Sequence, residues 1–125
     1  GYAVLEGVAF ALRDAMAAVT STGAVVPHCM LVGGGARSQY WAQLLANVLG
    51  RDMRTLHNSE LSASLGAAKL GFAAIGQRQL LATGLPIKNT FLPDAAHSAA
   101  LSLRYGRYRS LFPAVQALHQ LSDKE

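Results

Sequence analysis

The sequence predicts an α/β fold in which parallel strands are flanked by helices. Two short segments, residues 28–32 and 52–56, have the length and apolar content of strands. Each lies between segments in which apolar residues recur with helical spacing, and this alternation is typical of parallel sheets with helices on their faces. Two strands are too few for a stable sheet. We therefore expect further strands from residues outside this sequence, with strands overlooked inside it as the alternative.

Helices are predicted on both sides of the first strand. Residues 3–20 form one, with an apolar face made of Leu5, Val8, Leu12, Met16 and Val19. The next helix opens at Ala36 or Arg37 and ends at Gly50, because glycine readily adopts the left-handed conformation that follows a helix. Its buried face is expected to consist of Trp41, Leu44, Leu45, Val48 and Leu49.

The second strand leads into a third helix. Within residues 52–56, Met53 and Thr55 share one face of the strand. Asn58 or Ser59 is expected to cap the helix that follows. The apolar stripe of that helix is Leu61, Leu65, Ala68, Phe72 and Ile75, and small residues on its flanks, at Ala63, Gly66, Ala67 and Gly71, would let another backbone come close.

The last third of the chain is predicted to be a loop and a long helix. Glycine and proline recur in residues 76–93, which indicates a loop. Asp94 is expected to cap the helix rather than to act in catalysis. Pro113 should kink or divide this helix, because proline has no N–H group to continue the hydrogen bonding. Its apolar stripe is Leu101, Tyr105, Tyr108, Phe112, Val115 and Leu118.

The candidate binding site is the run of three glycines at residues 33–35, between the first strand and the second helix. Free N–H groups and the positive end of the helix dipole would face a polar ligand there. A tight turn without any ligand is an equally good interpretation of the pattern alone. Two familiar nucleotide motifs are not matched, since there is no GxxxxGK[ST] and a GxGxxG would need glycine at Ser38.

Composition narrows the class of protein. Only 14% of the residues are charged, which suggests that part of the surface is covered by something else. The net charge of +4 includes Arg104, Arg107 and Arg109, which we interpret as a solvated helix face rather than a nucleic-acid site. The single cysteine, Cys29, is expected to be a small buried apolar residue. No membrane span or signal peptide is recognised, so a cytoplasmic protein is expected.

No catalytic or metal-binding residue is expected within the chain. The seven carboxylates form no compact acidic group, and no serine, histidine and acid are spaced as a catalytic triad. The four histidines lack the spacing of metal ligands.

Three segments, in order, resemble the C-terminal end of the FGGY carbohydrate kinases. They are AVLEGVAF at residues 3–10, LVGGGARS at 31–38 and SASLGAA at 62–68. Residues 91–94 and the last helix, rich in arginine and tyrosine, are also similar, so the resemblance covers residues 1–125. It implies a portion of the second actin-like, ribonuclease H-like ATPase domain, in which parallel strands are flanked by helices and a long helix ends the chain.

The resemblance also implies which substrates and residues are involved. Such kinases bind ATP with Mg²⁺ and a sugar between two domains, and the nearest branch phosphorylates a ketopentose such as D-xylulose to D-xylulose 5-phosphate in xylose catabolism. Adenosine would lie against Gly34, Gly35 and Ala36, with Gln39 reaching the base or ribose, Ser38 as a further candidate, and Tyr40 and Trp41 in the core. Small residues of the third helix would pack beneath this turn.

By the same resemblance, the catalytic aspartate, the phosphate loops, most of the metal site and most of the sugar pocket lie outside these residues. The chain alone is therefore expected to be inactive. Its partners would be ATP, the ketopentose and the rest of the kinase chain, with a homodimer left open and no nucleic acid or membrane expected.

Three alternatives remain at this point. A nicotinamide-binding half domain would need an acidic residue after the second strand, where Leu56, His57 and Asn58 stand. A non-enzymatic nucleotide-binding or interaction module could use the basic last helix. Another FGGY kinase, acting on ribulose, gluconate or glycerol, would share the features of this part of the chain.

Overall fold

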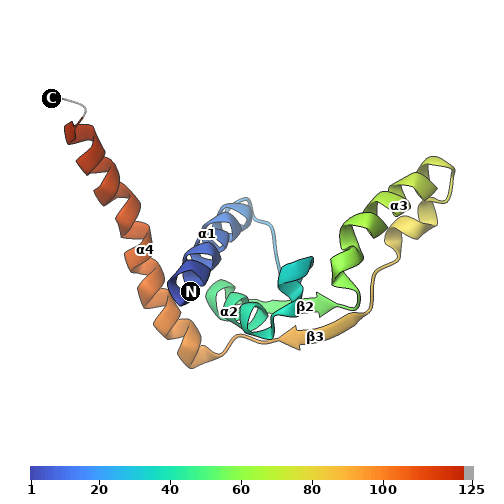
Figure 1. The fold of residues 1–125 in the computed structure, drawn as a ribbon, viewed down its shortest axis with the longest axis horizontal. Coiled ribbons are helices and arrows are strands. Elements are labelled where there is room, and N and C mark those ends of the chain that lie inside the picture. The colour runs from blue at the N-terminus through green and yellow to red at the C-terminus, as the bar shows by residue number, and fades with distance from the viewer. Residues whose placement is uncertain (123–125) are drawn as a thin grey trace.

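A computed structural model describes residues 1–122, except for the side chains of Glu60 and of residues 117–122. Helices and strands alternate as predicted (Figure 1). Their order is α1 (Tyr2–Thr20), β1 (His28–Leu31), α2 (Gln39–Leu49), β2 (Asp52–Leu56), α3 (Ser62–Ala74), β3 (Ile87–Phe91) and α4 (Ala95–Ser122). Short 3₁₀ turns η1 (Gly34–Arg37), η2 (Ser59–Leu61) and η3 (Arg78–Ala82) precede α2, α3 and β3.

The sheet is mixed, with the strand order β1-β2-β3. Strands β1 and β2 are parallel, with Leu31 opposite Thr55, as predicted. Strand β3 pairs antiparallel with β2 and places Phe91 opposite Met53. Two expectations were therefore wrong, because the sheet is not purely parallel and residues 76–93 contain a strand. The pattern missed β3 because it is a polar, largely exposed edge strand with little apolar alternation.

Helix α2 lies on the sheet and carries most of the core. The core consists of Ala42, Leu44, Leu45, Ala46 and Val48 from α2, together with Ala9, Phe10, Met53 and Leu101. Trp41 and Leu49 are partly buried against it, so the predicted face is confirmed. Tyr40 was expected in the core, yet it is 50% exposed. The helix also starts later than predicted, because Ser38 is its cap, and it ends at Gly50 with φ of 61° as expected.

Helix α1 has the predicted bounds but buries a different face. The expected face, with Leu5, Val8 and Leu12, is exposed. Instead, α1 turns Glu6, Ala9 and Phe10 towards its neighbours α2 and α4. The helix is apolar on more than one side, and only one of these sides has a partner among the described residues. The spacing of apolar residues cannot show which side that is.

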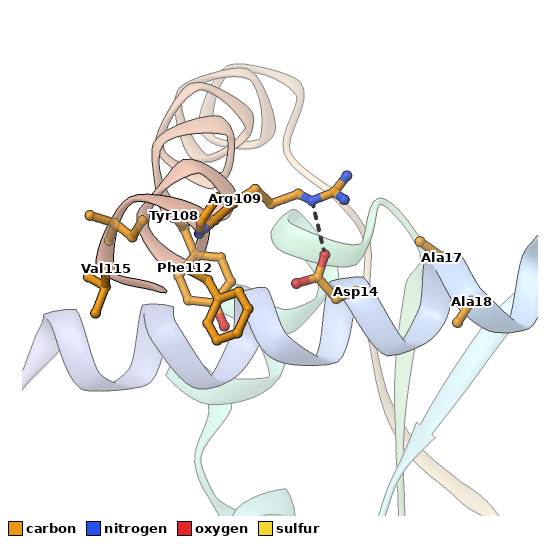
Figure 2. Close-up of a pocket in the computed structure, with 9 residues that line it drawn as sticks. Asp14, Ala17, Ala18, Tyr108, Arg109, Phe112 and Val115 are labelled. Atoms are coloured by element: carbon orange, nitrogen blue, oxygen red, sulfur yellow. Dashed lines mark ion pairs between the residues drawn. The ribbon is translucent and has the colours of Figure 1, made fainter. Parts of the chain in front are cut away.

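Aromatic packing and ion pairs join α1 to α4. The Phe10 ring packs on Tyr105 and Tyr108, with ring centroids 5.7 and 5.5 Å apart. Glu6 and Arg104 pair at 2.8 Å. Figure 2 shows a second pair, between Asp14 and Arg109 at 3.6 Å. Two arginines of the predicted basic face are thus engaged with carboxylates of α1. Beyond these pairs, both helices line an apolar groove of about 840 Å³ that includes Ala17, Ala18, Phe112 and Val115.

Helix α4 begins at the predicted cap. Asp94 Oδ1 accepts a hydrogen bond from the backbone N–H of His97 at 2.8 Å. The helix continues through Pro113, so the expected division does not occur. At that point the helix is exposed, and solvent can satisfy the carbonyl group that lacks a partner. The first half of the predicted stripe is confirmed, because Leu101 is buried and Tyr105 and Tyr108 are partly buried against the core. Phe112 and Val115 are exposed, and Leu118 lies outside the described side chains.

The Asp94 cap should make the helix content of α4 sensitive to acid. The backbone N–H of His97 and then its side chain hold the pKa of Asp94 below its usual value. A lowered pKa in the folded state means that the stabilisation is present above the unfolded value of about 3.9 and is lost as the pH falls through the folded value. Asp94→Ala should remove this step from an acid titration followed by circular dichroism. Asp52→Ala, at a carboxylate that caps no helix, should retain it, and identical titrations of both variants would contradict the assignment.

Helix α3 and η3 project from the sheet on the side away from α4 (Figure 1). No described residue of α3 is buried, and Leu70 and Ile75 are 67% and 75% exposed. Among the described residues, the predicted stripe is therefore mostly exposed, with Leu61 55% and Phe72 48% exposed and Leu65 half-buried. The small residues of α3 were expected to pack beneath the glycine turn, but α3 packs mainly on η3 and η2.

The open apolar faces of α1, α3 and α4 should cause self-association at high concentration. Exposed apolar surface is removed from water when chains associate, and patches of this kind are uncommon on monomers. Light scattering over a wide concentration range should show a rising mean mass. Leu70→Ser with Ile75→Ser should reduce the association, whereas Val25→Ser, at an exposed loop position, should not. A constant monomer mass would contradict the prediction.

Candidate functional site

The glycine turn connects β1 to α2 through η1. Gly33 has φ of 79° and ψ of −166°, a conformation that only glycine adopts without strain. Gly34 and Gly35 have no positive φ, so within the turn only the backbone conformation of Gly33 requires glycine. A requirement for glycine at Gly34 or Gly35 would therefore come from a group that lies close to the backbone, and not from the backbone conformation.

Three hydrogen bonds fix the ends of the turn. The N–H of Gly33 donates to the carbonyl of Ser59 at 3.0 Å, which joins the turn to η2. Ala36 and Ser38 donate to the carbonyls of Gly33 and Gly35, each at 3.2 Å. Because β1 and β2 are parallel, their carboxyl ends meet at one edge of the sheet, and both loops lie there. This is the edge at which α/β sheets commonly bind ligands.

Two N–H groups of the turn have no backbone acceptor. Among the residues and side chains that the structure describes, nothing accepts from Gly34 N or Gly35 N. Both glycines are exposed. These donors stand just before the N-terminus of α2, where the helix dipole favours electronegative groups. The turn therefore leaves two N–H groups without a described acceptor at the surface.

The five predicted site residues fall into two groups. Gly34, Gly35 and Ala36 form the start of η1. The two glycines are exposed, and Ala36 is half-buried. Ser38 Oγ already accepts from the Trp41 N–H at 3.2 Å, so its first role is to cap α2. Gln39 is the exposed first residue of α2, and its amide has no partner among the described side chains.

Trp41 packs against the core, as its spacing predicted, and it also reaches the glycine turn. A Cβ placed on Gly35 would lie 3.4 Å from Trp41 Cδ1 and 3.5 Å from its Nε1. The edge of the indole therefore lies on the side of Gly35 where a side chain would begin. The spacing of apolar residues placed Trp41 only in the core, and no pattern in the sequence could show that its ring reaches the turn.

The described carboxylates lie away from the turn or have other partners. Glu6 and Asp14 pair with arginines of α4, and Asp94 caps that helix. Asp52 begins β2, at the opposite end of the sheet from the turn. In the described part of the chain, no three histidine, cysteine or acidic residues are grouped as metal ligands. Partial burial raises the pKa of Cys29, as expected for a thiol packed against the core.

The main hollows between described residues are not lined by the five predicted site residues. The apolar groove between α1 and α4 lies elsewhere, and a second hollow of about 550 Å³ lies near Tyr2, Tyr40 and Arg104. A third hollow, of about 390 Å³, is lined by Asn58, Leu61 and Leu65 and lies beside η2, which contacts the turn. None of the described helices is apolar over a length sufficient to cross a bilayer.

Residues 1–75 match the C-terminal domain of the FGGY family of carbohydrate kinases, and the chain belongs to this family. Its relatives include the xylulose kinase of Escherichia coli (strain K12), which is 40% identical over 113 residues, covering 88% of this chain and 23% of the relative. The xylulose kinase of Klebsiella pneumoniae is 33% identical over 116 residues, covering 90% of this chain and 23% of its own length. The chain thus spans about a quarter of the length of these relatives.

Solved structures agree with the fold. A Brucella ovis structure described as a "xyloylose kinase" matches with a TM-score of 0.80 and 39% identity, over 93% of this chain and 24% of the other. A gluconate kinase from Lactobacillus acidophilus matches with a TM-score of 0.73 at 23% identity, over 90% and 23%, which shows the fold alone. The predicted family and the α/β class, as part of an actin-like kinase domain with a long last helix, are confirmed.

Proposed function

We propose that this chain is the adenosine-binding portion of a kinase that transfers the γ-phosphoryl group of ATP to D-xylulose. The surface that receives adenosine comprises Gly34, Gly35, Ala36, Ser38 and Gln39. The observation that carries the proposal is that the N–H groups of Gly34 and Gly35, at the carboxyl edge of the sheet, have no acceptor among the described residues. The 40% identity to a xylulose kinase supports the choice of sugar.

Each residue of this surface suits a nucleoside for a stated reason. The two exposed glycines leave the backbone bare, so a flat base or a ribose can approach its N–H groups closely. The Gln39 amide both donates and accepts hydrogen bonds, which matches a purine edge or a ribose hydroxyl. Ser38 contributes mainly by holding the start of α2 through its hydrogen bond with Trp41.

Magnesium does not fit this part of the chain. Mg²⁺ prefers carboxylate oxygens and water, and the described carboxylates are paired, capping or at the far end of the sheet. We therefore place the metal with the phosphates, mainly outside these residues. Phosphoryl transfer depends on positioning and charge neutralisation, and this chain contributes positioning. Its partners are ATP, the ketopentose and the rest of the kinase chain, which we place in the cytoplasm. A homodimer of that kinase is one assembly in which the chain would take part.

The second candidate is the same portion of a gluconate kinase. The family as a whole leaves this candidate open, since the gluconate kinase from Lactobacillus acidophilus shares the fold. The two candidates differ only in the sugar. Rates with D-xylulose and gluconate, measured on a kinase of the relatives' length that carries this chain, would separate them.

Gln39→Ala tests the adenosine surface directly. Losing one hydrogen bond should weaken ATP and ADP binding by about 1 kcal/mol, or roughly fivefold. Calorimetric titration of the 125-residue chain with each nucleotide would measure this change. Gln116→Ala is the matched control, since Gln116 is an exposed glutamine on α4, away from the turn. Equal affinities for both variants would remove Gln39 from the site, and a wild-type chain that binds neither nucleotide would overturn the proposed function.

A further inference from the structure

Trp41 connects three parts of the molecule around the glycine turn. Its indole ring lies against Gly35, within 3.4 Å of where a Cβ would stand. Its backbone N–H donates to Ser38 Oγ at 3.2 Å. The rest of the side chain packs against the hydrophobic core. It is also the only tryptophan of the chain.

The middle of the turn depends on this contact. Hydrogen bonds hold Gly33, Ala36 and Ser38, but Gly34 and Gly35 donate to nothing that the structure describes. Glycine has the greatest backbone freedom of any residue, so two adjacent glycines would sample many conformations. The first described atoms that a Cβ at Gly35 would meet are Cδ1 and Nε1, on the edge of the indole. This edge limits where the Gly35 peptide can lie.

We propose that Trp41 is a positioning residue for nucleotide binding. Its ring supports Gly35 and thereby holds the N–H groups of Gly34 and Gly35 in one arrangement, and the inference rests on the proposed function. Gly35 is then a glycine because the indole occupies the space of a larger side chain. A contact at 3.4 Å leaves room for a Cβ but not for the two methyl groups of valine.

Substitutions at Trp41 should separate support of the turn from support of the core. Trp41→Leu keeps an apolar side chain against the core but removes the ring beneath Gly35. If the competent arrangement of the turn then falls to about a tenth of the population, the affinity for ADP falls about tenfold. Trp41→Phe retains a flat ring and should recover most of the affinity. Leu49→Ala is the control, because Leu49 is also partly buried against the core, at the other end of α2.

The experiment uses amide NMR of the 125-residue chain, first without ligand and then with ADP. In the ligand-free chain, the ring should shift the Gly35 resonances. Trp41→Leu should abolish that shift and accelerate exchange of the amides of Ala36 and Ser38, whereas Trp41→Phe and Leu49→Ala should change exchange little. With ADP, Trp41→Leu should bind about tenfold more weakly than the other two variants.

The outcomes distinguish this inference from the proposed function. Unchanged turn amides in Trp41→Leu would overturn the positioning role, whatever ADP does. Turn amides that change while ADP affinity stays normal would overturn it too, because the arrangement of the turn would not govern binding. A wild-type chain that binds no ADP, but whose turn responds to Trp41→Leu, would overturn the proposed function and the nucleotide role together. Changes in both readouts, with recovery in Trp41→Phe, would support the inference.

Discussion

Gly34→Val is expected to raise the KM for ATP strongly and to leave the KM for the sugar nearly unchanged, in a kinase of the relatives' length that carries this chain. A Cβ on Gly34 meets no atom within 4 Å, and Gly34 has no positive φ. The folded chain therefore accommodates the new side chain, and only a ligand that approaches the backbone would meet it. Crowding of this kind costs about 1–3 kcal/mol, or roughly five- to hundredfold in affinity.

Gly35→Val should have the same effect on the KM for ATP, with an added loss of stability. At this position valine also presses on the Trp41 ring, so its melting temperature should fall while that of Gly34→Val should not. Gly84→Val is the matched control, because Gly84 likewise has open space around it and no positive φ. If Gly34→Val keeps the wild-type KM for ATP while sugar binding suffers, the turn has been assigned to the wrong substrate.

The 125-residue chain alone is expected to show no sugar kinase activity. Deprotonating a sugar hydroxyl needs a carboxylate near the transferred phosphate, and the carboxylates with described side chains are committed to α4 or lie at the far end of the sheet. Release of ADP with D-xylulose and Mg-ATP should therefore equal the background rate. Nucleotide binding by the same sample would show that it is folded.

Contaminating kinase is the main concern in that assay. Activity that follows the protein through two different columns and disappears in Gly34→Val would belong to the chain. Such turnover would refute the view that this part only positions the nucleotide.

Local signals in the sequence were sufficient for several elements. Helix α2 ends at Gly50 and helix α4 is capped by Asp94, both as expected. A helix cap depends on the capping residue itself and its nearest neighbours. The buried face of α2 was also predicted, since a sheet, α1 and α4 surround this helix and its apolar residues are therefore buried. These features need no knowledge of distant contacts.

Features that depend on distant partners could not be predicted. Strand β3 is polar and exposed, and it is a strand because β2 offers it an edge. The burial of Phe10 instead of Leu12 depends on where α4 lies. At the candidate site, the five residues lie within the six positions 34–39, so their proximity was certain. The positive φ at Gly33 depends on the distant carbonyl of Ser59, and the Gly35 contact depends on the direction of the indole ring.

The pairing of α1 with α4 has a consequence for the order of folding. Their contacts join residues about ninety positions apart, such as Arg13 with Ser102. The unit β1–α2–β2 instead closes over a short stretch, with His28 opposite Asp52. Loop-closure entropy rises with the separation of the contacting residues, so the short unit should form first and the two long helices should join later. The glycine turn lies inside the β1–α2–β2 unit, so its shape should be set before α1 and α4 pack together.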